Sequence, residues 1–179
     1  MTGKKIFIIT GLSGSGKSTA LDVMEDAGFY CVDNMPVSLL PKFIELPLQH
    51  NADITGLAFL MDAREKDFIA HHAAIFDALK ADGHRLEIIF LEANDKDLLN
   101  RYSQTRRYHP LGRNQNLVDG IQREKAALEA LRISADQIIN TTGLTVHELK
   151  MIIRDMVNHQ DRIRMKIHVM SFGFKYGIP

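Results

Sequence analysis

The stretch KIFIITGLSGSGKST, residues 5–19, decides the fold. Its apolar run Ile6 to Ile9 predicts a buried β-strand, and the apolar residues from Leu21 to Ala27 recur at the spacing of one helix face. Between these two elements, residues 11–18 match the pattern G-x-x-x-x-G-K-[ST]. A strand, a glycine-rich loop and a helix in this order predict a phosphate-binding loop.

The residue types in this loop fit the chemistry of a nucleotide. Glycines let successive backbone N–H groups converge on an anion, Lys17 adds a positive charge for the β and γ phosphates, and the Ser18 hydroxyl suits Mg²⁺. We therefore predict that ATP or GTP binds with Mg²⁺, in contact with Gly11, Leu12, Ser13, Gly14, Ser15, Gly16, Lys17 and Ser18. The alternative, a flexible loop that only joins a strand to a helix, does not require this pattern. The choice between ATP and GTP stays open, because Asn94-Asp95-Lys96-Asp97 has the guanine-selecting element of signalling GTPases in the wrong order.

Short apolar runs alternate with helical stripes along the chain, which is typical of βαβ units around a parallel sheet. The fold class predicted is α/β, a P-loop NTPase with a parallel sheet flanked by helices, as in nucleotide kinases. A helix is expected to begin at Thr145, with Glu148 completing a capping box. The expected strands are Ile6 to Ile9, Phe29 to Val32, Ile54 to Met61, Leu86 to Leu91, Gln137 to Asn140 and Ile167 to Met170.

Polar residues that close the predicted strands are the candidates for chemistry, because ligands bind beyond the carboxyl ends of strands in such sheets. Asp62 closes the most apolar strand, and we expect it to hold Mg²⁺ together with Ser18. Its alternative role is to cap a helix beginning near Glu65. Asp33 could orient an acceptor or a water molecule, or cap its own turn. Lys17, Asp33 and Asp62 are the predicted catalytic residues.

Arginines are the second group of candidates. Arg64 lies two residues after Asp62. Arg101, Arg106 and Arg107 lie in or next to the stretch from Tyr102 to Asn116, which has the composition of a charged loop. Guanidinium groups can close over developing phosphate charge and exclude water, so these three residues are expected to form a lid. The alternative is a solvated charged loop.

Composition limits the classes of protein. A chain of 179 residues fits one compact domain, and its 22 Lys and Arg against 22 Asp and Glu give no electrostatic reason to bind nucleic acid or a membrane. The single cysteine, Cys31, forms no internal disulfide, and the apolar runs are too short to cross a membrane. A cytoplasmic protein without membrane association is expected.

Several further motifs accompany the phosphate loop of Gly11 to Ser18. They are Gly28 to Asn34, Asp62-Ala63-Arg64, Arg101-Tyr102-Ser103, Thr105-Arg106-Arg107, His109-Pro110-Leu111 and Ser171 to Lys175. Together with the loop, these motifs resemble one family, the RNase adapter RapZ/YvcJ nucleotide-binding proteins of bacteria. The resemblance implies ATP bound by residues 11–18, and a GTP element formed by Asp62, Ala63, Arg64 and Glu65, the last of which replaces an Asn found in some members.

The resemblance also implies an organisation. Residues 1–165 would form the P-loop nucleotide-binding domain, and residues 166–179 would begin the connection to a C-terminal domain absent from this chain. That domain would bind small regulatory RNA and work with an endoribonuclease, and the full-length protein is expected to form a homo-oligomer.

Three functions stay open at this point. The first is a regulatory nucleotide-binding domain with slow NTP hydrolysis, in an RNase adapter. The second is a kinase that transfers the γ-phosphate to a small molecule or nucleoside, because Asp33 and the arginine lid would also serve that reaction. The third is an interaction module for protein or RNA that has lost nucleotide binding.

Overall fold

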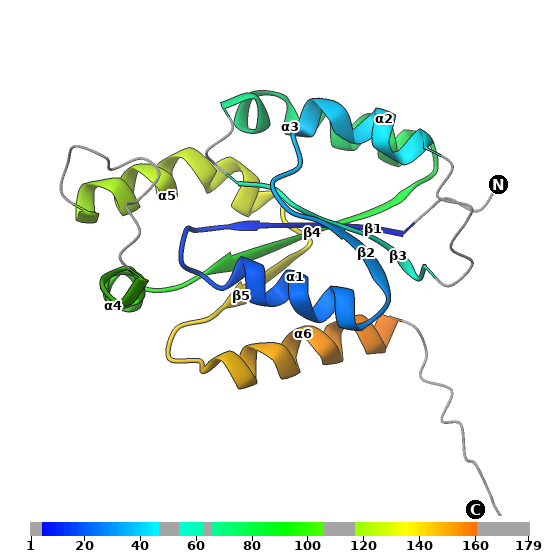
Figure 1. The fold of residues 1–179 in the computed structure, drawn as a ribbon. Helices are drawn as coiled ribbons and strands as arrows, with labels where there is room; N and C mark the ends of the chain where they lie inside the picture. Colours follow the sequence, from blue (N-terminus) through cyan, green and yellow to red (C-terminus); the bar gives the residue numbers. More distant parts are fainter. Residues whose placement is uncertain (1–4, 47–53, 63–65, 106–116, 161–179) are drawn as a thin grey trace, which may run out of the picture.

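Five parallel strands form one sheet in the order β2-β3-β1-β4-β5. The computed structural model describes residues 5–46, 54–62, 66–105 and 117–160. In Figure 1 the first strand lies at the centre of the sheet, between its two hydrogen-bonded neighbours. The strands are β1 (Lys5–Gly11), β2 (Phe29–Val32), β3 (Gly56–Leu60), β4 (Arg85–Glu92) and β5 (Gln137–Asn140).

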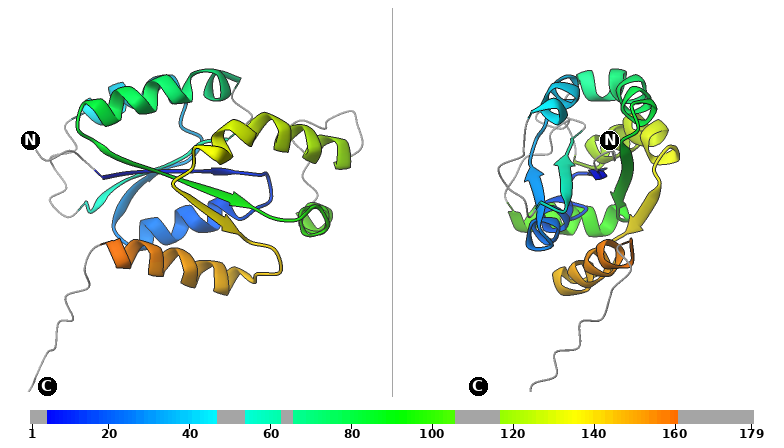
Figure 2. Two further views of the ribbon diagram at one scale, coloured as in Figure 1. Left: turned by 180° about the vertical axis from the view of Figure 1, so that it is seen from behind. Right: turned by 90° about the vertical axis from the view of Figure 1, so that its right-hand side faces the viewer.

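Helices cover both faces of the sheet. Figure 2 shows α1 and α6 on one face and α2, α3 and α5 on the other. The fourth helix, α4, lies near the end of the molecule at which β1 and β4 terminate. The helical elements are α1 (Lys17–Asp26), the 3₁₀ turn η1 (Val37–Leu39), α2 (Leu40–Glu45), α3 (Lys66–Ala81), α4 (Asp95–Thr105), α5 (Leu117–Ile133) and α6 (Val146–Gln160).

The central strand separates two apolar cores. Phe7 and Ile9 pack with the helices α1 and α6, whereas Ile6 and Ile8 pack in the core beneath α3 and α5. All four side chains are completely buried. Each contributes about 2 kcal/mol through removal of apolar surface from water. Because alternate side chains of β1 are buried in the two cores, the strand is anchored to the helices on both faces of the sheet, and this fixes the position of the loop that follows it.

The predicted α/β fold is confirmed. The strands Phe29 to Val32 and Gln137 to Asn140 have the predicted bounds, and the other three predicted strands within the described ranges match the observed ones to within two residues at each end. The prediction of a loop from Tyr102 onward was wrong for its first four residues, because the helix α4 continues to Thr105. The expected strand Ile167 to Met170 and the domain boundary near residue 165 lie outside the described residues. Across the ranges that the structure describes, no helix is long and apolar enough to cross a membrane.

Candidate functional site

The loop from Gly11 to Ser18 lies between β1 and α1, as predicted. Two of its glycines are required by geometry. Gly11 has φ +128°, and a Cβ built there would lie 2.0 Å from the Leu91 carbonyl oxygen of the neighbouring strand. Gly16 has φ +101°, and a Cβ there would lie 2.6 Å from Leu149 Cδ2. At Gly11 the loop therefore passes too close to the backbone of β4 for a side chain, and at Gly16 the positive φ itself favours glycine.

The first turn of α1 is left open toward the loop. Gly16 is the N-cap residue, and among the described residues no side chain caps this end and none in the first turn is acidic. A helix start presents unpaired N–H groups and a partial positive charge, both of which favour an anion. The Ser18 hydroxyl belongs to an exposed residue of this turn. This cradle fits a phosphate group.

Lys17 and Asp62 meet at the ends of β1 and β3. The Lys17 ammonium donates hydrogen bonds to the carbonyl oxygens of Gly11 at 2.9 Å and Leu12 at 3.0 Å. Its Nζ lies 3.9 Å from Asp62 Oδ2, and both residues are 7% exposed. The structure thus brings the predicted lysine and the predicted carboxylate together beside the loop, while the role of Asp62 and Ser18 toward Mg²⁺ stays a prediction.

Arg101 of α4 and Thr141, which follows β5, form hydrogen bonds with backbone carbonyl groups of the loop. Arg101 donates hydrogen bonds to the Gly14 carbonyl at 3.1 Å and to the Thr141 carbonyl at 2.7 Å and hydroxyl at 3.0 Å. The Thr141 hydroxyl also lies 3.0 Å from the Ser15 carbonyl oxygen. Arg101, which was predicted to belong to a lid, therefore lies on α4 in contact with the loop backbone. Whether it acts as a lid stays a prediction.

Glu124 of α5, which was not among the predicted site residues, binds the loop at Ser13. Its Oε2 accepts the Ser13 backbone N–H at 2.9 Å and its Oε1 accepts the Ser13 hydroxyl at 2.6 Å. The Glu124 side chain is completely buried. A signal for it does exist in the sequence, because position 124 fills the gap in the helical stripe formed by Leu117, Ile121, Leu128 and Leu131. A carboxylate at a core-facing position of such a stripe needs a partner elsewhere in the fold.

The other predicted site residues differ in their surroundings, and some of them are not described. Asp33 follows β2 and is exposed. The Ser15 hydroxyl is buried and has no hydrogen-bond partner among the described residues. Within the described ranges, no group of three or more His, Cys, Asp or Glu side chains could hold a metal ion. Ala63, Arg64, Glu65, Arg106 and Arg107 lie outside the described residues.

Cys31, the single cysteine, is not a reactive candidate. Burial raises its pKa to about 12, helped by the negative charges of Glu25 and Asp22, so the thiol stays protonated at neutral pH. Its Sγ lies 3.6 Å from the Leu21 carbonyl oxygen.

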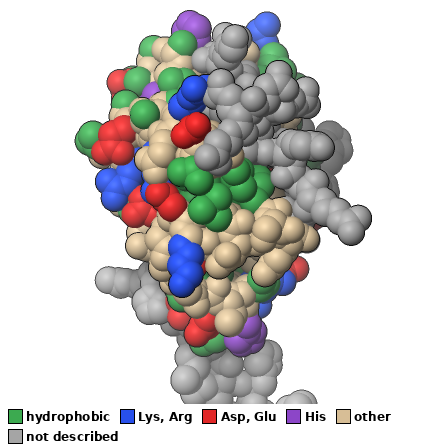
Figure 3. Space-filling view, turned by 90° about the vertical axis from the view of Figure 1, so that its left-hand side faces the viewer, with side chains coloured by type: hydrophobic (Ala, Val, Ile, Leu, Met, Phe, Trp, Pro, Cys, Tyr) green, Lys and Arg blue, Asp and Glu red, His purple; other side chains and the backbone are tan. Residues whose placement is uncertain are grey.

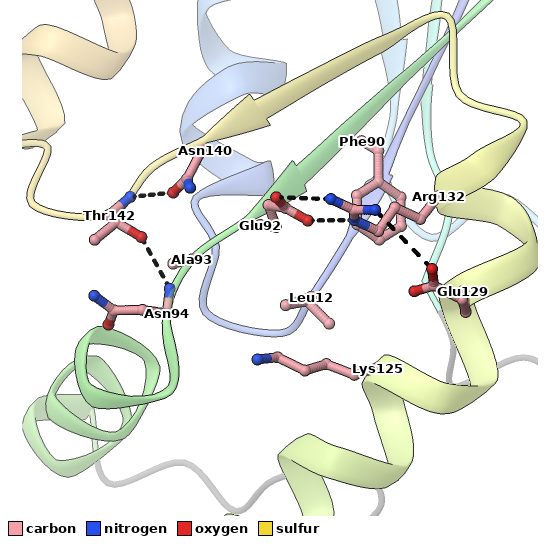
Figure 4. Close-up of a pocket in the computed structure, with 10 residues that line it drawn as sticks. All are labelled: Leu12, Phe90, Glu92, Ala93, Asn94, Lys125, Glu129, Arg132, Asn140 and Thr142. Atoms are coloured by element: carbon pink, nitrogen blue, oxygen red, sulfur yellow. Dashed lines mark hydrogen bonds and ion pairs between the residues drawn. The ribbon is translucent and has the colours of Figure 1, made fainter.

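A pocket of about 290 Å³ adjoins the loop on the side of α5 (Figure 4). Leu12 and Phe90 line it. Arg132 and Glu92 also line it, and the Arg132 guanidinium donates hydrogen bonds from Nε to Glu92 Oε2 at 2.6 Å and from Nη2 to Oε1 at 3.3 Å. This hydrogen bonding and the Glu92 charge raise the Arg132 pKa further. Lys125, which also lines the pocket, pairs with Asp95. Since these charged side chains already have partners, the pocket is less suited to phosphate than the open start of α1.

Comparison with protein families decides the identity of the domain. The family model described as the RapZ-like N-terminal domain matches residues 4–161. This chain belongs to that family. A "Nucleotide-binding protein" of Desulfosudis oleivorans is 59% identical over 175 residues, which are 97% of this chain and 60% of the relative. One from Geobacter sulfurreducens is 42% identical over 98% of this chain and 62% of its own length. This RapZ-like domain therefore spans about 60% of the length of the curated relatives it matches.

Solved structures agree with the fold of the RapZ-like domain. It is similar to shikimate kinase from Acinetobacter baumannii, with a TM-score of 0.57 and 15% identity over 91% of this chain and 97% of that one. It is also similar to the tunicamycin resistance protein of Deinococcus radiodurans, with a TM-score of 0.60 and 16% identity over 86% and 95% of the two chains. At this identity the likeness concerns the fold alone, which is that of the kinase-like P-loop proteins.

Proposed function

We propose that this RapZ-like domain binds ATP or GTP together with Mg²⁺ in the loop from Gly11 to Ser18 and hydrolyses it slowly. The observation that carries the proposal is the open N-terminus of α1 behind a glycine loop, with Lys17 beside Asp62. The names of the relatives support the same ligand class.

The residues of the loop have separate roles in this proposal. Backbone N–H groups at the start of α1 bind the phosphates, and Lys17 exchanges its carbonyl partners for phosphate oxygens. Ser18 and Asp62 would hold Mg²⁺, which neutralises phosphate charge when bound. Asp33, and the undescribed residues Arg64, Arg106 and Arg107, are the candidates for contacts to the terminal phosphate.

Calorimetry of Lys17→Ala with Mg·ATP and Mg·GTP tests the site. Loss of hydrogen bonds to a charged group is worth about 1.5–3 kcal/mol, so affinity should fall by roughly 10- to 150-fold. Lys125→Ala is the matched control, since Lys125 lies near the loop but pairs with Asp95, and it should stay within about threefold of the unchanged chain. Equal affinities of Lys17→Ala and the unchanged chain would contradict the proposal.

A wider role follows from family membership. We propose that the full-length protein is a cytoplasmic RNase adapter that forms a homo-oligomer and binds small regulatory RNA and an endoribonuclease outside this domain. The balanced charge of the domain supports this division, and on the described part of the face in Figure 3 Lys and Arg are interspersed with Asp and Glu. Pull-down of RNA by the full-length protein and by residues 1–165, each with and without nucleotide, tests it. RNA retained by residues 1–165 alone would contradict the proposed division.

A second candidate is transfer of the γ-phosphate to a small molecule. The position of Asp33 favours it, because Asp33 is exposed at the end of β2. This strand pairs with β3, after which Asp62 lies. Screening sugars and nucleosides for phosphorylation decides between the two functions. Transfer faster than hydrolysis, abolished in Asp33→Asn, would favour the kinase.

A further inference from the structure

Glu124 occupies a position at which a charge is costly. It lies in the buried stripe of α5 between Ile121 and Leu128, and its side chain has no exposed surface. A buried carboxylate destabilises a fold unless hydrogen bonds replace its water. Ser13 of the phosphate loop supplies a hydrogen bond to each oxygen of Glu124.

The contact fixes a backbone orientation. Because Glu124 accepts both the N–H and the hydroxyl of Ser13, the peptide group between Leu12 and Ser13 cannot rotate without breaking a bond to a buried carboxylate. On the other side of the loop, Arg101 and Thr141 hold the carbonyls of Gly14 and Ser15. The segment immediately before the open start of α1 is therefore held from two directions by contacts within the protein itself.

We propose that Glu124 is a positioning residue for nucleotide binding, which acts through Ser13 to hold the loop in the conformation that receives the phosphates. This inference rests on the proposed function of the loop. Its physical basis is preorganisation, because a loop already ordered before binding loses less conformational entropy when the nucleotide arrives. Helix α5 thereby contributes to nucleotide affinity without touching the nucleotide.

The contact with Ser13 consists of two hydrogen bonds, which an uncharged side chain of the same length can also form. A glutamine side chain can accept the Ser13 N–H with its oxygen and donate to the Ser13 hydroxyl with its amide. A carboxylate near the loop also repels phosphate, and glutamine removes this repulsion. Glu124→Gln should therefore restore most of the affinity that Glu124→Ala loses.

The experiment measures Mg·ATP and Mg·GTP affinity by calorimetry, and the rise in Tm caused by nucleotide, in the 179-residue chain. We expect Glu124→Ala to weaken both affinities by about tenfold and to reduce the nucleotide-induced rise in Tm. Glu129→Ala is the control: it removes the same charge from the same helix, at a side chain that is 56% exposed. It should leave both quantities close to those of the unchanged chain.

Several results would overturn the inference. If Glu124→Ala lowers the Tm equally with and without nucleotide while the affinity stays the same, Glu124 has only a structural role. If Glu124→Gln keeps the affinity but abolishes hydrolysis, Glu124 takes part in the reaction itself. If Glu124→Ala does not fold, Ser13→Ala decides: affinity weakened by about threefold supports the inference, and unchanged affinity overturns it.

A last comparison separates this inference from the proposed function. If the unchanged chain binds neither nucleotide at saturating Mg²⁺, the proposed function fails and this inference fails with it. If the unchanged chain binds nucleotide and Lys17→Ala does not, while Glu124→Ala binds as tightly as the unchanged chain, only this inference fails.

Discussion

The helices α1 and α6 lie side by side on one face of the sheet, yet they begin in opposite ways. At the start of α6, Glu148 Oε2 accepts the Thr145 N–H and hydroxyl, each at 2.8 Å, and the Glu148 N–H donates to the Thr145 hydroxyl oxygen at 3.2 Å. At the start of α1, Gly16 offers no side chain. One helix supplies its own carboxylate, whereas the other leaves its positive end for an anion from outside.

The glycines that precede the two helices should respond very differently to substitution. Both glycines have positive φ, +101° at Gly16 and +71° at Gly143, before α6. Gly16→Ala adds a Cβ 2.6 Å from Leu149 Cδ2, whereas Gly143→Ala adds one with no atom within 4 Å. We expect Gly16→Ala to lower the free energy of unfolding by about 2–4 kcal/mol and Gly143→Ala by about 1 kcal/mol. Urea unfolding measures both. Equal losses would show that Leu149 yields easily and that close packing does not require a glycine at position 16.

Placing a carboxylate in the first turn of α1 should convert it into a helix start like that of α6. Thr19 stands three residues after Gly16, as Glu148 stands three residues after Thr145. In Thr19→Glu the added charge repels phosphate, so nucleotide affinity should fall by about tenfold, while the stability without nucleotide rises by about 0.5 kcal/mol. Calorimetry against the uncharged Thr19→Gln separates charge from size. A Thr19→Glu chain that binds nucleotide as well as Thr19→Gln would argue against phosphate at this helix end.

Removal of the cap of α6 should affect stability alone. Thr145→Ala deletes the hydroxyl that takes part in two of the three capping bonds, at a cost of about 1 kcal/mol in the free energy of unfolding. Since Thr145 has no described contact with the phosphate loop, nucleotide affinity should stay within about twofold. A larger change in affinity would indicate that the two helix starts are coupled.

The smallest effect concerns pH. The hydrogen bonds from the Thr145 backbone and hydroxyl hold the pKa of Glu148 below its usual range. A carboxylate whose pKa is depressed by folding stabilises the protein above its unfolded pKa and loses that contribution as pH falls through its folded pKa. Glu148→Gln should therefore reduce stability at neutral pH and make it less sensitive to acid, as followed by thermal unfolding from pH 7 downward. A parallel pH dependence in both chains would contradict the assignment.

The sequence predicts those parts of the molecule in which local pattern and tertiary environment agree. The loop from Gly11 to Ser18 and the box of Thr145 and Glu148 are examples, because spacing alone specifies which backbone groups each residue can reach. The strand register could not be predicted in the same way, since Ile6 pairs with Leu57 and Leu86, which are distant in the chain.

Contacts decided by the approach of distant elements were missed. The helical stripe marks Glu124 as core-facing, but it does not identify the partner, because Ser13 lies 111 residues away in the chain. Arg101 lies in a charged segment whose composition suggests a loop, yet Asn94 starts a helix there by accepting the Asp97 N–H at 2.7 Å. That helix places the Arg101 guanidinium against the loop backbone, a position that no local pattern specifies.

The central place of β1 has a consequence for synthesis on the ribosome. The strand is translated before either of its partners, which begin only at Gly56 and Arg85. Its two edges must therefore wait for much of the domain to emerge before they are hydrogen-bonded. Contacts of such long sequence separation slow folding and expose apolar segments meanwhile. The nascent chain should thus be most dependent on chaperones before residue 92 leaves the exit tunnel.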